Sequence, residues 1–179
     1  IAREEVLIGK LLAHLAILAL AVLLGHGLAA GVAFWTDENA LDGLPALARL
    51  SWSSILLGAT FLGAGYALSS LSRRPSGAAG LAIGLWLGLV VLYDLALLSA
   101  IVADNGGWFT TEAFPIALIA NPADAFRLFN LTASGATAAA AGVGGAADAI
   151  PLWQSLTSVL LWPLVALALA AAAFRKVTP

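Results

Sequence analysis

Residues 11–34 read LLAHLAILALAVLLGHGLAAGVAF, a run that contains no Asp, Glu, Lys or Arg. A helix needs about 20 apolar residues to cross a hydrocarbon core about 30 Å thick, so this run is long enough to span a membrane. Three more runs of similar length follow, at residues 52–71, 78–103 and 152–174. The sequence therefore predicts an all-α, polytopic membrane helical bundle with four transmembrane helices.

The composition agrees with a single membrane domain over residues 1–179. Hydrophobic residues make up 61% of the chain and charged residues 10%, whereas soluble domains carry about 25% charged residues. The net charge of −2 gives no reason to expect nucleic acid as a partner, and the lack of cysteine excludes disulfides, iron–sulfur clusters and thiolate zinc sites. Methionine is absent even at position 1, so we expect an N-terminal part of the protein to be missing.

Basic residues gather at alternate ends of the four runs. Six of the eight lie on one predicted side of the membrane: Arg3, Lys10, Arg73, Arg74, Arg175 and Lys176. The other side receives Arg49 and Arg127 together with seven of the ten acidic residues. Loops rich in Lys and Arg face the cytoplasm, so both ends of the chain are predicted to be cytoplasmic.

The connection at residues 104–151 is too long for a simple link between two helices. It contains the apolar stretch 114–120, which begins with Phe114 and is too short to span, followed by Asn121 and Pro122, a typical start of a helix. That helix carries Asp124, Phe126, Arg127 and Phe129. We expect an outer segment that re-enters the membrane or lies on its surface as an amphipathic helix. Such backbone is tolerated at depth only where protein or a cavity surrounds it.

Small residues predict helix–helix packing in the third run. Gly80, Gly84 and Gly88 recur every four residues and fall on one face of the helix. Glycine lets two helix backbones approach closely in lipid, and we expect a close contact along this face.

Three polar residues fall within the predicted spans. Asp94 should face the interior of the bundle, because an acid exposed to hydrocarbon is costly. It would serve either as an ion or proton site or as a structural hydrogen-bonding group. His14 and His26 lie about 18 Å apart along one helix, so they cannot hold one metal ion together. Hydrogen bonds between helices are the simpler expectation for both, and no metal site or catalytic residue is predicted.

The first ten residues, IAREEVLIGK, run straight into the first span. They resemble a stretch of ABC-2-type exporter permeases, in which an Arg, an acid and a closing Gly-Lys lie at the cytoplasmic start of the third transmembrane helix. The resemblance places Arg3, Glu4, Glu5 and Lys10 on the side that couples to an ATPase. Those permeases have six spans and a short re-entrant element between the fifth and sixth. The four spans here would then be helices three to six.

Two further stretches, LWLGLVVLYDLALL at 85–98 and NPADAFRLFNL at 121–131, resemble the branch of this family that serves nitrous oxide reductase maturation in denitrification. The resemblance implies a permease homodimer in a bacterial inner membrane, a cytoplasmic ATPase dimer that binds ATP and Mg, and a periplasmic accessory subunit. The permease itself would not be an enzyme and would hold no cofactor. The outer residues Phe114, Asn121, Asp124, Phe126, Arg127 and Phe129 would form a gate or dock the periplasmic partner.

The resemblance implies copper-site assembly, but copper(I) pathways favour Cys and Met ligands, and this chain has neither. Our hypothesis is that the spans transmit the ATPase cycle outward, or pass a non-metal species such as a sulfur compound, without coordinating copper. Two alternatives stay open. One is a redox, haem or ion-conducting membrane protein that uses His14, His26 or Asp94, and the other is a structural membrane anchor.

Overall fold

The computed structural model describes residues 3–72, 74–132 and 150–175, and all regular structure in these ranges is helical. Four helices are long and apolar enough to cross a membrane, which confirms the predicted fold class. The elements are α1 (Arg3–Thr36), η1 (Ala40–Gly43), α2 (Leu44–Leu71), α3 (Pro75–Leu87), a π-helical turn η2 (Gly88–Leu92), α4 (Tyr93–Asp104), a second π-helical turn η3 (Phe109–Ala113), α5 (Phe114–Ala120), α6 (Pro122–Leu131) and α9 (Leu152–Arg175).

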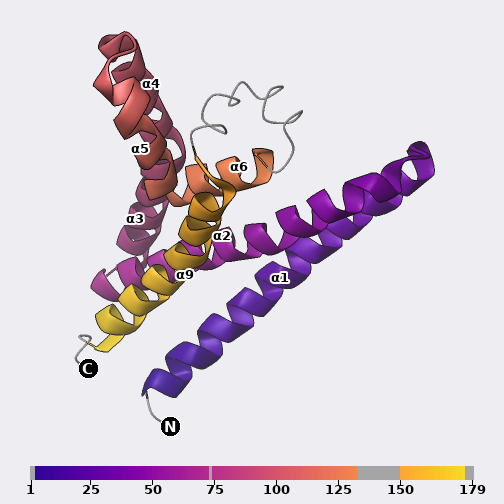
Figure 1. Cartoon of the computed structure of the whole chain (residues 1–179). Helices are drawn as coiled ribbons and strands as arrows, with labels where there is room; N and C mark the ends of the chain where they lie inside the picture. Colours follow the sequence, from indigo (N-terminus) through magenta and orange to yellow (C-terminus); the bar gives the residue numbers. More distant parts are fainter. Residues whose placement is uncertain (1–2, 73, 133–149, 176–179) are drawn as a thin grey trace.

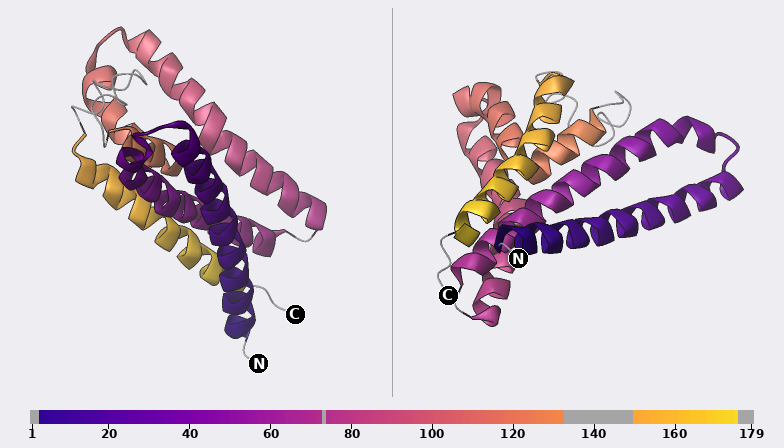
Figure 2. Two further views of the ribbon diagram at one scale, coloured as in Figure 1. Left: turned by 90° about the vertical axis from the view of Figure 1, so that its right-hand side faces the viewer. Right: turned by 90° about the horizontal axis from the view of Figure 1, so that it is seen from below.

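The helices form two limbs that diverge toward the outer end (Figures 1 and 2). One limb is the α1–α2 hairpin, and the other contains α3, α4 and α5. Between them lie α9, which packs mainly along α2, and the short α6, which contacts α2, α9 and η2. The start of α1 and the end of α9 lie at the same end of the bundle (Figure 1), as an even number of spans requires.

The outer connection between the first two spans is shorter than the sequence indicated. The span was expected to start at residue 52, but α2 begins at Leu44, with Pro45 in its first turn. Proline suits this position because its fixed φ is helical and the first backbone N–H groups of a helix have no partner in the helix. The hairpin is therefore nearly all helix, and only residues 37–43 separate α1 from α2.

Close helix packing occurs on α2 and not on the glycine face of α3. A Cβ built on Gly63 would lie 2.9 Å from the backbone carbon of Ala166 on α9, whereas a Cβ built on Gly80, Gly84 or Gly88 would meet no described atom within 4 Å. The contact predicted for that glycine face is thus not made within the described part of the chain. Gly63 is the residue that lets the α2 and α9 backbones approach.

The buried core lies where α6 meets α2 and α9. Ala125 and Phe129 of α6 pack against Val159 of α9, and the Phe129 ring stands edge-on to Trp52 of α2 at 5.3 Å between ring centroids. Pro163 lies within α9 and is buried. The short amphipathic helix is therefore a central element of the bundle and does not lie on its outer surface.

The α2–α9 contact yields a direct test. Gly63→Val is expected to destabilise the protein by about 1–3 kcal/mol, because the neighbour that must move is backbone and overpacking of this kind has costs in that range. Gly65→Val is the matched control, since it adds the same side chain to the same helix with nothing within 4 Å. Thermal unfolding in detergent measures both variants. Equal midpoints would contradict a close approach of the two helices at Gly63.

Candidate functional site

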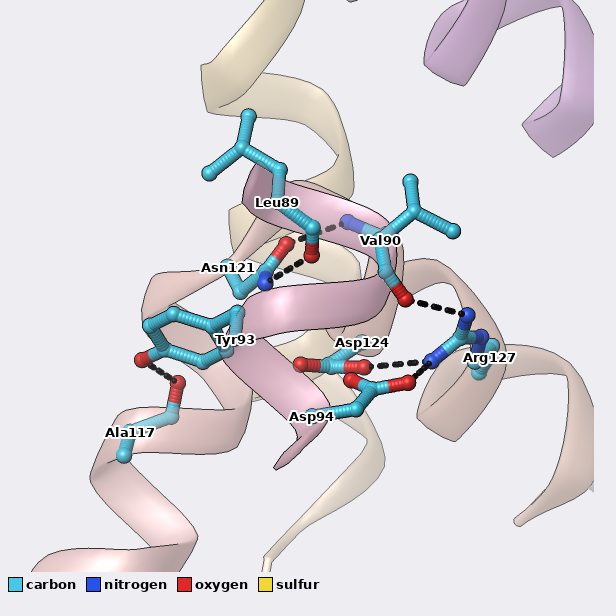
Figure 3. Close-up of polar contacts among 9 residues, drawn as sticks. Leu89, Val90, Tyr93, Asp94, Ala117, Asn121, Asp124 and Arg127 are labelled. Carbon is cyan, nitrogen blue, oxygen red and sulfur yellow. Dashed lines mark hydrogen bonds and ion pairs between the residues drawn. The ribbon is translucent and has the colours of Figure 1, made fainter. Parts of the chain in front are cut away.

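A group of polar contacts surrounds the π-helical turn at Gly88–Leu92 (Figure 3). This turn joins α3 to α4, so that Pro75–Asp104 forms one continuous helix, called here the third span. Leu89 lies about 21 Å from either end of the third span, counting 1.5 Å per residue. π-Helical turns disturb the regular backbone bonding and are frequent at functional sites. Here the Leu89 carbonyl accepts a hydrogen bond from Nδ2 of Asn121 at 2.7 Å.

Arg127 of α6 lies between two carboxylates. Its Nη1 is 2.5 Å from Oδ2 of Asp94 on the third span and 2.9 Å from Oδ1 of Asp124 on its own helix. Its other terminal nitrogen lies 3.5 Å from the Val90 carbonyl. Figure 3 shows the two carboxyl groups side by side, with the guanidinium group facing both. We call Asp94, Arg127 and Asp124 the charged cluster.

The three members of the charged cluster differ in exposure. Asp124 is 5% exposed, whereas the side chains of Asp94 and Arg127 are 39% and 42% exposed. Oδ2 of Asp124 is buried and has no hydrogen-bond partner. Burial raises the pKa of Asp124 to about 7, the neighbouring Asp94 carboxyl adds to the rise, and Arg127 opposes it. Asp94 thus pairs with an arginine of another helix.

The segment that carries Asp124 and Arg127 returns from the outer end of the third span to its middle. The chain reverses at Asn105 and Gly106, which both have positive φ, and η3 and α5 then lead back along α4 (Figure 1). The hydroxyl of Tyr93 donates to the Ala117 carbonyl at 2.8 Å. Residues 109–131 therefore form a re-entrant segment, one of the two arrangements that the sequence indicated.

Asn121 fixes the angle between α5 and α6. Its Oδ1 accepts a hydrogen bond from the backbone N–H of Ala123 at 2.9 Å, which caps the N-terminus of α6 as the sequence predicted. Its Nδ2 group reaches the Leu89 carbonyl at the same time. One fully buried side chain thus both starts α6 and ties it to the third span.

Three cavities in the described part of the chain border the re-entrant segment, and one of them, of about 490 Å³, meets it only at Pro122. The other two lie along α5. The first, of about 250 Å³, has the charged cluster at one end and apolar walls elsewhere, formed by Leu97, Leu98, Ile101, Phe114, Leu118, Leu128 and Leu131. The second, of about 680 Å³, separates α5 from α9 and includes Gln154, Thr157 and Ser158. The polar outer half of α9 therefore faces protein and a cavity.

The two histidines connect α1 to α2. His26 donates from Nδ1 to the hydroxyl of Ser51 at 2.8 Å, because that hydroxyl already donates to the Leu47 carbonyl. Nδ1 of His14 bonds to the Lys10 carbonyl at 2.7 Å and lies 2.9 Å from the Tyr66 hydroxyl. Within the described ranges no three His, Cys, Asp or Glu residues come close enough to hold a metal ion.

The remaining predicted site residues are spread along the chain. Arg3 and Glu4 lie in the first turn of α1, and their side chains fall outside the described residues, while Glu5 and Lys10 are exposed near the inner end. Of the predicted docking residues, Asn121, Asp124 and Phe129 are buried inside this chain. In this conformation those three side chains position the re-entrant segment and offer no surface to a partner.

The sequence did not predict that backbone carbonyl groups take part in the site. The carbonyls of Leu89 and Val90 and the bond from Tyr93 to Ala117 belong to the site, yet apolar residues at 89 and 90 give no signal of a π-helical turn. Tyr93 could have been predicted as a site residue, since it is a polar neighbour of Asp94 within an apolar run.

Comparison with known proteins agrees with this architecture. Residues 1–178 match the model of the family described as ABC-2 family transporter protein. The chain is similar to a protein of Pseudomonas aeruginosa called probable ABC transporter permease protein NosY, with 43% identity over 97% of the chain and 64% of the relative. A protein of Stutzerimonas stutzeri with the same name is 38% identical over the same shares. The chain thus spans just under two thirds of each relative.

Removal of the Asn121 side chain tests the site. Asn121→Ala is expected to lower stability by about 1–3 kcal/mol, because it removes a helix cap, which is worth about 0.5–2 kcal/mol, and the hydrogen bond to the Leu89 carbonyl, which is worth about 0.5–1.5 kcal/mol. Asn39→Ala is the control, since exposed Asn39 precedes η1 without a side-chain capping bond. Thermal midpoints in detergent that fall equally in both variants would refute the role given to Asn121.

Proposed function

Because the chain belongs to the ABC-2 transporter family, we propose that it is the permease subunit of an ATP-driven transporter for copper-site assembly of nitrous oxide reductase. The observation that carries the proposal is the 43% identity to a permease called NosY over nearly the whole chain. The resemblance of residues 85–98 and 121–131 to the branch that serves nitrous oxide reductase maturation points the same way.

The proposed assembly is a permease homodimer in a bacterial inner membrane, with both ends of this segment in the cytoplasm. A cytoplasmic ATPase dimer binds ATP and Mg and engages the inner end of α1, near Arg3–Lys10. A periplasmic accessory subunit meets the outer face. The charge pattern supports this orientation, as does the position of the start of α1 and the end of α9 at one end of the bundle.

A continuous chain of contacts supports a mechanical role. Leu18 of α1 lies against Gly58 of α2, and Gly63 seats α2 against α9. Both of these helices hold α6 in the core, and Arg127 links α6 to the third span. A displacement of the inner end of α1 by the ATPase would reach the re-entrant segment through these contacts.

The proposed role excludes copper coordination by the spans. Copper(I) prefers thiolate and thioether ligands, which this chain lacks, and the two histidines lie about 18 Å apart along one helix. The permease instead transmits the ATPase cycle outward, or passes a non-metal species such as a sulfur compound. Copper binding then falls to the partner proteins.

The test uses the full-length protein in a denitrifying strain that lacks its own permease, with the copper content of purified nitrous oxide reductase as the readout. Wild type is expected to restore copper loading. The double variant His14→Gln/His26→Gln should restore it equally, because hydrogen bonds between membrane helices contribute only about 0.6 kcal/mol each. Immunoblotting confirms equal permease levels.

Two results would contradict the proposal in different ways. If the reductase is loaded with copper in the absence of any permease, the permease is not needed for copper-site assembly and the proposed function is wrong. The histidine variant could instead lose copper loading at a normal permease level, with stoichiometric copper bound to the purified wild-type permease alone. These two results together would show that the spans coordinate copper.

A further inference from the structure

We propose that the charged cluster is a proton-binding site, in which one proton is shared by the carboxyl groups of Asp94 and Asp124 and fastens α6 to the third span. The proton resides on the buried carboxyl group of Asp124, which lies beside the Asp94 carboxylate. Arg127 neutralises the one negative charge that remains on the pair. The inference rests on the geometry of this chain alone and does not depend on the proposed function.

The first argument is the unpartnered oxygen. Asp124 is 95% buried, its Oδ1 accepts from Arg127, and its Oδ2 is buried without a partner. A buried charged oxygen without a hydrogen bond is costly. Figure 3 places this carboxyl beside that of Asp94. If both groups are ionised, two negative charges lie side by side, whereas a proton on Asp124 removes one of these charges and the cost of an ionised oxygen without a partner.

The second argument is net charge at depth. Two carboxylates and one guanidinium sum to −1, and one bound proton brings the sum to zero. Asp94 lies about 15 Å from the outer end of the third span, counting 1.5 Å per residue from Asp104. Uncompensated charge at such a depth is expensive, so the neutral form of the cluster is the stable one.

The third argument is that no other described charge compensates Asp124. The third span contributes Asp94 and Tyr93, and the Tyr93 hydroxyl already donates to Ala117. α5 has no titratable residue, and the only charged residue of α9 is Arg175 at the far end of that helix. α2 carries Arg49 and Tyr66, and no ion pair or hydrogen bond joins either of them to Asp124.

The affinity of the site for a proton allows it to bind and release that proton near neutral pH. The raised pKa of Asp124, about 7, means that the shared proton is bound below neutral pH and released above it. Release leaves two like charges in contact, which weakens the hold of the third span on α6. The partly exposed Asp94 and Arg127 side chains, next to the cavity of about 250 Å³, give the proton a route to the site.

Infrared difference spectroscopy of the full-length protein in lipid vesicles tests the proposal. Wild type should show the carbonyl band of a protonated carboxyl group that disappears as pH rises through about 7. Asp124→Asn should abolish this band. Asp94→Asn should move its titration to lower pH, because it removes the neighbouring negative charge. Glu112→Gln, which alters an exposed acid in η3 away from the cluster, should leave the band unchanged.

A stability measurement gives a second readout. A carboxyl group with a raised pKa in the folded state binds its proton more tightly there than when unfolded, so its stabilising effect is full below about pH 4 and is lost as pH rises to about 7. The thermal midpoint of wild type should therefore fall over this interval relative to Asp124→Asn. Above about pH 7 the difference between the two should stay constant.

The contradicting outcomes are specific. A wild-type spectrum without a titrating carboxyl band near neutral pH would overturn the proposal, and so would the same band in Asp124→Asn. If Asp124→Asn does not fold, Asp94→Asn and Glu112→Gln still decide the matter. An unshifted titration in Asp94→Asn would then count against a shared proton.

Discussion

Arg127 on α6 contacts Asp94 on the third span, and the position of the whole re-entrant segment depends on this contact. Neither charge is stable alone at the depth where the two meet. Arg127 and Asp94 therefore stabilise each other, and their ion pair holds α6 against the third span. Asp124, Asn121 and the carbonyls of Leu89 and Val90 at the π-helical turn complete the same set of contacts.

The re-entrant segment must satisfy its own backbone, because non-helical backbone survives at membrane depth only inside protein or along a cavity. The break between α5 and α6 meets this requirement through Asn121, which serves the start of α6 and the third span at once. On the opposite face, Phe129 and Ala125 pack into α2 and α9. α6 is thus held by charge on one face and by close packing on the other.

Much of the fold could be predicted from the sequence, because length and hydropathy determine which helices span a membrane. Asn121 and Pro122 correctly marked the start of α6, and Asp94 was expected to need a partner. The identity of that partner was not predictable, since Arg127 is 33 residues away and reaches Asp94 only after the chain reverses at Asn105 and Gly106. Local sequence does not encode such a contact.

The glycines show the same limit. Periodicity favoured Gly80, Gly84 and Gly88 as a packing face, but the close approach occurs at Gly63, where α9 happens to cross α2. Small residues indicate where another helix can approach closely. The tertiary arrangement decides at which of these positions the close approach occurs. The site depends on the π-helical turn at Gly88–Leu92. The glycine and apolar residues that form this turn give no sequence signal for it.

The most direct test of the central contact is a double-mutant cycle between Asp94→Asn and Arg127→Gln, with unfolding free energies measured in one detergent at one pH. If the two side chains hold α6 on the third span, the double variant should be less destabilised than the sum of the single variants by about 1–3 kcal/mol, as expected of residues in one ionic network. Additivity within about 0.5 kcal/mol, as found for independent sites, would contradict the account.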